Sequence, residues 1–324
     1  MFGETLESTG RDALALARTL RTMTTLTGIG LHSGKPVTLT VHPAAGSGIR
    51  FRRIDLLEGQ APEGQEERLA AVTVRAAPDA VTKTQLGTVI ANEHGVTVST
   101  VEHLMAAFAG LGIDHALVEL DGPEVPIMDG SAAPFLAALE RAGLRDLPTP
   151  RLALRITAPI RVELGDAWAE IAPLKEGEQG CPLDITVDYK DPAIGRQRLV
   201  TGGTALEFRQ DVAAARTFCD LADVEAMRAQ GLAQGGSMEN AIVVSEGRVL
   251  NEDGLRMATE FVAHKALDLI GDLHLLGRPL LGRVTAFKPG HALNTRLAAA
   301  IAASPFVAET VMPEDAEAGL RVQA

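Results

Sequence analysis

The sequence predicts two α+β domains of related design that face each other. Both halves of the 324-residue chain run through strand-like and helix-like segments in a similar order. A segment over 148–152, with two prolines close together near the middle of the chain, is typical of a linker. The two halves also share a set of three residues at the same relative positions: His103, Ala107 and Gly110 in the first half, and His264, Asp268 and Gly271 in the second. A site between two such domains is a usual place for a ligand.

The first domain is expected over 21–147, after an N-terminal extension over 1–20 that we expect to be helical or loosely ordered. Gly28–Leu31 is expected to form a turn, and the polar, acidic stretch over 56–68 a surface loop. Alternation of apolar and polar residues predicts strands over 37–41, 95–99 and 115–120. Helices are expected over 101–109, where Gly110 and Gly112 can cap the end, and over 134–142.

The second domain is expected over 153–304, and the remaining residues, 305–324, are expected to form a C-terminal tail. Its predicted strands lie at 153–163, 167–172, 183–189 and 281–287. Its predicted helices lie at 260–276 and 292–303, with a mixed region over 205–250 between strands and helices.

The composition is that of an ordinary soluble enzyme, with 46% apolar and 22% charged residues. No apolar run approaches the roughly 18 residues of a membrane span. The net charge of −12 argues against nucleic acid as the main partner, although a few lysines can still form a local site for a small anion. The acidic N-terminus lacks a signal pattern, and Cys181 and Cys219 lack disulfide or CxxC spacing, so we expect a cytoplasmic protein.

A helix around His264 carries the strongest chemical signal. On a helix His264 and Asp268 would lie on one face, about 6 Å apart, which suits two ligands of one metal ion with a third from elsewhere. Asp272 continues this row by another four residues, within an otherwise apolar helix. The pair Glu102-His103 likewise opens an apolar helix, and a buried charge needs a partner or a metal. Together these segments lead to a zinc hydrolase hypothesis.

The glycine-rich turn over 28–36 does not indicate a nucleotide-binding loop. Three residues separate Gly30 from Gly34, a proline follows Lys35, and a strand comes next. The P-loop needs GxxxxGK[ST] before a helix, and the dinucleotide motif needs two residues between its last glycines. We therefore exclude both motifs.

Six motifs occur in an order that closely resembles one known family. They are STVEHLMAAFAGLGID (99–114), PIMDGSAAPF (126–135), ARTF (215–218), LNEDGLR (250–256), HKALDLIGDL (264–273) and FKPGHALN (287–294). Over about Thr24–Leu297 the chain is similar to the UDP-3-O-acyl-N-acetylglucosamine deacetylases of lipid A biosynthesis. The resemblance implies a fold of two similar α+β domains, each a β-sheet layered on helices, with the active site at the domain interface.

The resemblance also implies the reaction, which is zinc-dependent hydrolysis of the N-acetyl group of UDP-3-O-[(3R)-3-hydroxyacyl]-N-acetylglucosamine. The family's ligands for one zinc ion correspond to His103, His264 and Asp268, and iron(II) fits the same ligands. The family's catalytic residues correspond to Glu102 as general base, Thr217 as donor to the oxyanion, and His291 with its partner Asp272. How Glu102 and His291 divide the proton transfers stays open.

Substrate-binding residues are implied in the same way. Lys265 and Lys288 correspond to lysines near the nucleotide sugar, and Phe218 to a residue that packs on a sugar face. An insert over about 217–245 corresponds to an apolar passage for the acyl chain, with Leu221, Val224, Ser237 and Met238 among its residues. The acyl chain also leaves open a transient contact with a membrane surface.

Two alternatives remain at this point. The metal ligands alone permit a zinc peptidase or another zinc amidohydrolase, although the sequence has no HExxH motif and the passage-like insert has no obvious use there. A non-catalytic binding protein with the same fold is the other alternative, but a binder has no need of the general base that Glu102 provides.

Overall fold

The computed structural model describes residues 16–57, 64–305 and 307–311 of the chain. Two five-stranded sheets dominate it. The first sheet has the spatial order β2 (Thr24–Ile29), β3 (Pro36–Pro43), β9 (Ala116–Leu120), β4 (Ile49–Arg53), β5 (Thr73–Arg75). The second has the order β12 (Ile160–Leu164), β13 (Ala167–Ala172), β20 (Arg283–Phe287), β14 (Leu183–Asp188), β15 (Arg196–Thr201).

The two sheets share one pairing pattern. In each, the third and fourth strands in space are parallel, β9 with β4 and β20 with β14, and every other neighbouring pair is antiparallel. A repeated strand order with the same single parallel pair agrees with the related design that the sequence spacing predicted.

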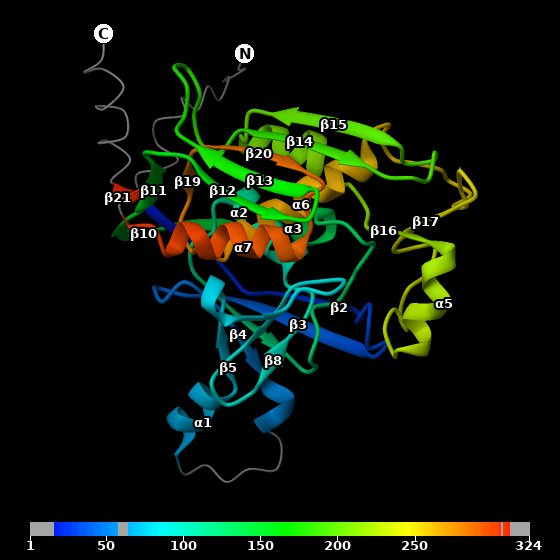
Figure 1. Cartoon of the computed structure of the whole chain (residues 1–324). Coiled ribbons are helices and arrows are strands. Elements are labelled where there is room, and N and C mark those ends of the chain that lie inside the picture. The colour runs from blue at the N-terminus through cyan, green and yellow to red at the C-terminus, as the bar shows by residue number, and fades with distance from the viewer. Residues whose placement is uncertain (1–15, 58–63, 306, 312–324) are drawn as a thin grey trace, which may run out of the picture.

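Helices lie between the two sheets (Figure 1). These are α2 (Glu102–Leu111), α3 (Ala133–Ala142), α6 (Glu260–His274) and α7 (His291–Ala302). The central contact joins α2 to α6, while α6 and α7 also pack on strands of the second sheet. Both α2 and α6 are buried along most of their length, and their apolar side chains lie in one continuous core. That burial stabilises two helices that also carry buried charged groups.

Smaller elements extend from this arrangement. The short helices are α1 (Gln65–Ala71), α4 (Ala205–Glu207) and α5 (Leu221–Ala229). The small sheets pair β1 (Leu16–Leu20) with β10 (Leu144–Pro150), and join β6 (Val81–Lys83), β7 (Val89–Ala91) and β8 (Thr97–Val98). Two more contain β19 (Leu280–Leu281), β11 (Ala153–Ile156), β21 (Ala308–Val311) and β16 (Phe218–Asp220), β17 (Ile242–Ser245), β18 (Arg248–Val249). The α5 helix projects at one side of the molecule, next to β16 and β17 (Figure 1).

The predicted α+β class is confirmed, and the helices that carry the chemical motifs were predicted within a few residues of their ends. Several local expectations are wrong. The predicted strand 153–163 is two strands of different sheets, β11 and β12. Residues 148–150 of the expected linker belong to β10, and residues 308–311 of the expected tail form β21. Residues 16–20 form β1 instead of a helical or loose segment, because they pair with β10; residues 1–15 lie outside the described part. Gly28 and Ile29 belong to β2, and the turn comes after them. The helix α1 begins at Gln65, inside the stretch expected to be a loop, of which 58–63 lie outside the described part.

A close approach of backbones explains why α6 carries a glycine in its buried interior. A methyl group on Gly271 would overlap the backbone carbonyl of Glu102 in α2. The two helices therefore cross at the point where Glu102 and His103 face His264 and Asp268, and only glycine allows that approach.

We expect Gly271→Ala to lower the free energy of unfolding by about 1–3 kcal/mol, because overpacking at the crossing outweighs the better helix propensity of alanine. Separation of the helices should also weaken metal binding. Chemical denaturation and metal titration measure the two effects. Gly46→Ala is the matched control, since a methyl group there has no neighbour within 4 Å and the backbone is unstrained. Equal stability of the two variants would contradict this account.

Candidate metal centre and active-site cavity

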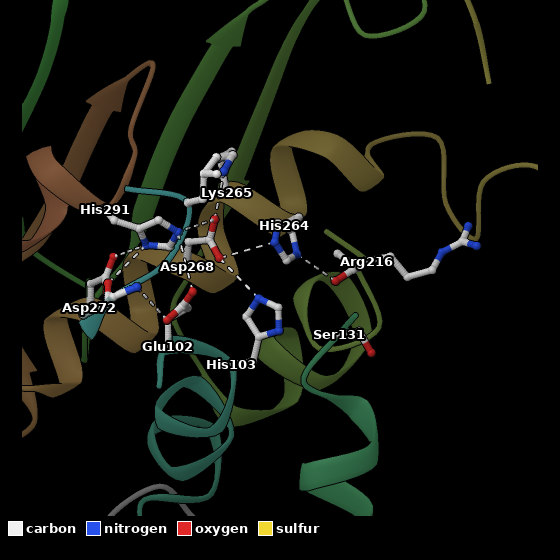
Figure 2. A network of polar contacts seen from close by, with 12 residues as sticks. Glu102, His103, Ser131, Arg216, His264, Lys265, Asp268, Asp272 and His291 are labelled. Atoms are coloured by element: carbon white, nitrogen blue, oxygen red, sulfur yellow. Dashed lines mark hydrogen bonds and ion pairs between the residues drawn. The ribbon is translucent and has the colours of Figure 1, made fainter. Parts of the chain in front are cut away.

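Three predicted ligands converge at the crossing of α2 and α6. Ligand atoms of His103, His264 and Asp268 all lie within 4.8 Å of one another, and all three residues are buried. Nε2 of His103 is 3.7 Å, and Nε2 of His264 3.3 Å, from Oδ1 of Asp268. Figure 2 shows the two imidazoles and the carboxylate pointing toward one another from the two helices. This was the central geometric prediction from the sequence, and the structure places the three residues together.

Neighbouring groups fix how two of these ligands are oriented. Nδ1 of His264 donates to the backbone carbonyl of Ala215 at 3.0 Å, which leaves Nε2 free of its proton and facing Asp268. Nζ of Lys265 donates to Oδ2 of Asp268 at 2.9 Å, so the other oxygen is turned toward the imidazoles. Burial lowers the pKa of His264 to about 3, so its ring is neutral, as a ligand requires.

Oδ1 of Asp268 provides the test of whether a cation fits. This oxygen is buried and has no hydrogen-bond partner among the described residues, although it lies between two imidazole nitrogens. A buried polar atom without a partner is costly, and a cation at this point would satisfy it. Two imidazoles and one carboxylate are a donor set that zinc accepts, with a fourth position left open. The residues present therefore fit a catalytic zinc ion.

A second cluster adjoins the ligands. Glu102 is the first residue of α2, and its Oε1 is 3.7 Å from Nε2 of His291, the first residue of α7. Nδ1 of His291 is 3.0 Å from Oδ2 of Asp272. The cluster is almost fully buried, with His291 the most accessible member. A carboxylate at a helix N-terminus is favoured by the backbone dipoles, whereas a cationic histidine there needs the acidic groups around it.

The pKa values of Glu102 and His291 in this cluster are both raised, for different reasons. Burial alone would lower the pKa of His291, but Asp272, Glu102 and Asp268 outweigh it and raise that pKa to about 10. His291 is therefore a cation near neutral pH. Burial raises the pKa of Glu102, and the positive charge of His291 opposes part of the rise. A carboxyl group with a raised pKa beside a cationic imidazole is an arrangement that supports proton transfer in both directions.

The segment that contains Thr217 is held by a buried ion pair. Nε of Arg216 contacts Oε1 of Glu260 at 2.8 Å, and both side chains are almost completely buried. Glu260 begins α6, one turn before His264, so this pair ties the segment to the ligand helix. The backbone N–H of Thr217 donates to the carbonyl of Gly130 at 2.9 Å. Sequence reasoning quoted Arg216 within its motif and did not assign this role.

A cavity of about 840 Å³ reaches these groups through its lining residues Thr217 and Lys265, and most of the predicted substrate residues line it. Thr217, Phe218, Lys265, Leu221, Val224, Ser237 and Met238 all line it. The Phe218 ring is 6.2 Å from the His264 ring, which brings the cavity to the metal ligands, and Nζ of Lys265 lies 5.2 Å from the Phe218 ring centre. Lys288 is not among the described residues that line this cavity, and its Nζ pairs with Asp166 instead.

Comparison with known proteins agrees with this geometry. The model of one protein family, UDP-3-O-acyl N-acetylglycosamine deacetylase, matches residues 17–303. The chain belongs to the UDP-3-O-acyl N-acetylglycosamine deacetylase family. It is similar to deacetylases of that description from Aliivibrio fischeri, at 45% identity over 92% of this chain and 93% of the relative, and from Sodalis glossinidius, at 48% over 92% and 93%. A third, from Photobacterium profundum, is 46% identical over 88% and 90%.

The resemblance seen in the sequence motifs is thereby confirmed, together with membership of a deacetylase family. The family match runs from β1 through α7, so it covers both sheets and all residues of the two clusters. Among the described helices of this family member, none combines the length and the apolar character that a membrane span needs.

Several residues of the deacetylase site were not assigned a role from the sequence. Thr88 contacts both Glu102 and Asp272, Asn294 donates to Asp272 at 2.9 Å, and His32 lines the cavity. Asn294 stands three residues after His291, and this spacing on a helix could have suggested a shared face. Thr88 and His32 come from other parts of the chain, and no spacing connects them to the motifs.

Proposed function

We propose that this protein hydrolyses the N-acetyl group of UDP-3-O-[(3R)-3-hydroxyacyl]-N-acetylglucosamine, releasing acetate and the free amine in lipid A biosynthesis. The observation that carries the proposal is the convergence of His103, His264 and Asp268 beside Glu102 and His291. Lys265, which donates to Asp268, lines a large cavity next to this cluster. The names of the relatives supply the substrate class.

The proposed cofactor is one zinc ion, held by His103, His264 and Asp268; iron(II) would use the same ligands. When bound with an open fourth position, zinc acts as a Lewis acid and lowers the pKa of a water molecule to about 7. The free oxygen of Asp268 and the neutral ring of His264 support this assignment.

Glu102 is proposed to accept the proton of the attacking water, because it adjoins the ligand His103, its Oε1 lies 3.7 Å from Nε2 of His291, and its Oε2 is held by the backbone N–H of Thr88. As the C–N bond breaks, the leaving nitrogen needs a proton, which Glu102 or the cation of His291 can donate. Asp272 keeps His291 protonated and oriented through its 3.0 Å contact with Nδ1.

The cavity supports the proposed substrate binding. Thr217 lines its wall next to Phe218, and we assign the Thr217 hydroxyl to the oxyanion that forms from the acetamide. Lys265 is placed to meet a polar or anionic part of the sugar nucleotide, and Leu221, Val224 and Met238 give the acyl chain an apolar wall. Each buried methylene contributes about 0.8 kcal/mol, so a long acyl chain adds several kcal/mol. Lys288 is proposed to contact the substrate only after leaving Asp166.

Three further assignments accompany the proposal. The two halves, 21–147 and 153–304, are proposed as domains, each with one of the two similar sheets. The enzyme is proposed to work in the cytoplasm, on a sugar nucleotide whose acyl chain allows transient contact with the membrane surface. The net charge of −12 supports the absence of a nucleic-acid partner.

Acetate release tests the function. Zinc-replete protein is expected to release one acetate for each UDP-3-O-acyl-N-acetylglucosamine consumed, a strong chelator should stop the release, and added zinc should restore it. Elemental analysis is expected to find one zinc per chain. Folded, zinc-replete protein that consumes no sugar nucleotide would sink the proposal, and turnover of peptides in the same assay would favour a peptidase.

A further inference from the structure

Thr88 lies between the two halves of the proposed catalytic cluster, although it comes from neither of the motif helices. It immediately precedes β7 and is completely buried. Both its backbone N–H and its backbone carbonyl form hydrogen bonds at the start of α2. The N–H donates to Oε2 of Glu102 at 3.0 Å, and the carbonyl accepts from the N–H of Val101 at 3.4 Å.

The Thr88 side chain reaches the other half of the cluster. Its hydroxyl is 2.5 Å from Oδ1 of Asp272 and 3.3 Å from Nδ1 of His291. A carboxylate can only accept, so the hydroxyl donates to Asp272. Its oxygen is left to accept a longer, shared contact from the Nδ1–H that His291 directs mainly to Oδ2 of Asp272. One hydroxyl thus serves both members of the His291–Asp272 pair.

The two carboxylate oxygens of Asp272 accept hydrogen bonds from different donors. Oδ2 accepts from Nδ1 of His291 and from Nδ2 of Asn294. Within the part of the chain that the structure describes, Thr88 supplies the one hydrogen bond to Oδ1. Without it, the carboxylate would keep both bonds on one oxygen and could rotate about its last torsion, which is broad and weakly held by the side chain itself.

We propose that Thr88 is a positioning residue of the deacetylase reaction: its hydroxyl holds Asp272 so that His291 faces the reaction centre, while its N–H turns Oε1 of Glu102 to the same point. The inference rests on the proposed function, because the groups it positions are the proposed acid and base. It also links residues 184 positions apart, Thr88 in the first half and Asp272 in the second.

Thr88→Val tests the role of the hydroxyl apart from the rest of the residue. Valine keeps the volume, the branched shape and the backbone N–H, and loses only the hydroxyl with its contacts to Asp272 and His291. We expect kcat about 10- to 100-fold lower, which is the range for loss of one hydrogen bond to a charged group, with KM within about twofold. Zinc content should stay at one per chain. Thr88→Ser restores the hydroxyl and is expected to recover most of the lost kcat.

Thr19→Val is the matched control. Thr19 is also completely buried, and its hydroxyl donates to the carbonyl of His115 at 2.8 Å and accepts from the N–H of Ala44 at 3.0 Å, away from both clusters. Both valine variants should unfold at a lower temperature than the original protein. Only Thr88→Val should lose kcat.

A double-mutant cycle shows whether the hydroxyl acts through Asp272. In an Asp272→Asn background, Thr88→Val should change kcat by less than about twofold, because the group it positions is already gone. A second readout needs no turnover: the ¹⁵N resonances of the His291 imidazole, at one fixed pH, should shift in Thr88→Val and stay in place in Thr19→Val.

Three results would overturn the proposal. They are an unchanged kcat in Thr88→Val, a Thr88→Ser variant as slow as Thr88→Val, and unchanged His291 resonances in Thr88→Val. If Thr88→Val does not fold, Thr88→Ser and Thr88→Ala decide the matter by the same comparison. If the original protein releases no acetate, the proposed function fails, and the His291 resonances still decide the positioning role.

Discussion

Glu102→Gln is expected to lower kcat by about 10²–10⁴-fold and to leave KM and zinc content almost unchanged. Glutamine keeps the shape of the side chain, and its carbonyl oxygen can still accept the N–H of Thr88 that now reaches Oε2. It cannot take a proton from water. The loss should therefore fall on the chemical step, which steady-state acetate release and zinc analysis together can show.

The control for Glu102→Gln is another buried carboxylate outside the clusters. Asp114 accepts from Nε of Arg151 at 2.8 Å and from the N–H of Arg18 at 2.8 Å, so Asp114→Asn removes the charge of a carboxylate that is also buried. That variant should lose stability and keep kcat. A Glu102→Gln protein that turns over at the original rate would show that another group is the base.

Asp268→Asn should have a comparably large effect, this time on the metal. The Oδ1 atom of Asp268 lies within 3.7 Å of both imidazole nitrogens, so Asp268→Asn removes the negative charge next to them that would hold a cation. Because changes even to outer partners of ligands cost 10- to 100-fold in metal affinity, we expect the zinc dissociation constant to rise by more than about 100-fold. Competition with a chromophoric chelator measures it.

Acetate release by Asp268→Asn should fall below detection at low zinc and recover in part at high zinc. The control is Asp184→Asn, which removes an equal charge from a surface carboxylate paired with Arg198. It should bind zinc as the original protein does. Equal zinc affinity of Asp268→Asn and Asp184→Asn would remove Asp268 from the ligand set.

The parts of the fold that sequence predicted best are those with a strong period. In α6, His264, Asp268 and Asp272 follow one another at four-residue steps among apolar residues, and both the helix and the common face of His264 and Asp268 follow from that pattern. The third ligand, His103, was implied by the family resemblance. The strand β13 was predicted at its observed bounds, because a turn precedes its alternating residues. These signals are local, so a single sequence contains them.

The rest depends on contacts between distant segments. The strand β1 exists because residues 16–20 find a partner in β10, which lies more than 120 residues away. The α5 helix has little amphipathic pattern and no buried residue, so the sequence showed only a mixed region there. The role of Thr88 cannot be predicted from the sequence, because it depends on contacts with Glu102 and Asp272 that only the fold creates. Lys288 faces Asp166, a pairing that no motif contains.

The division of the cluster between two similar sheets has a consequence for the protein during its synthesis. As a nascent chain leaves the ribosome, α2 is made long before α6, and His291 comes later still. An unfinished polypeptide therefore has His103 and Glu102 without the other metal ligands and without His291. Hydrolytic competence would then arise abruptly, when the late helices dock against α2. The timing of this onset would report on co-translational assembly.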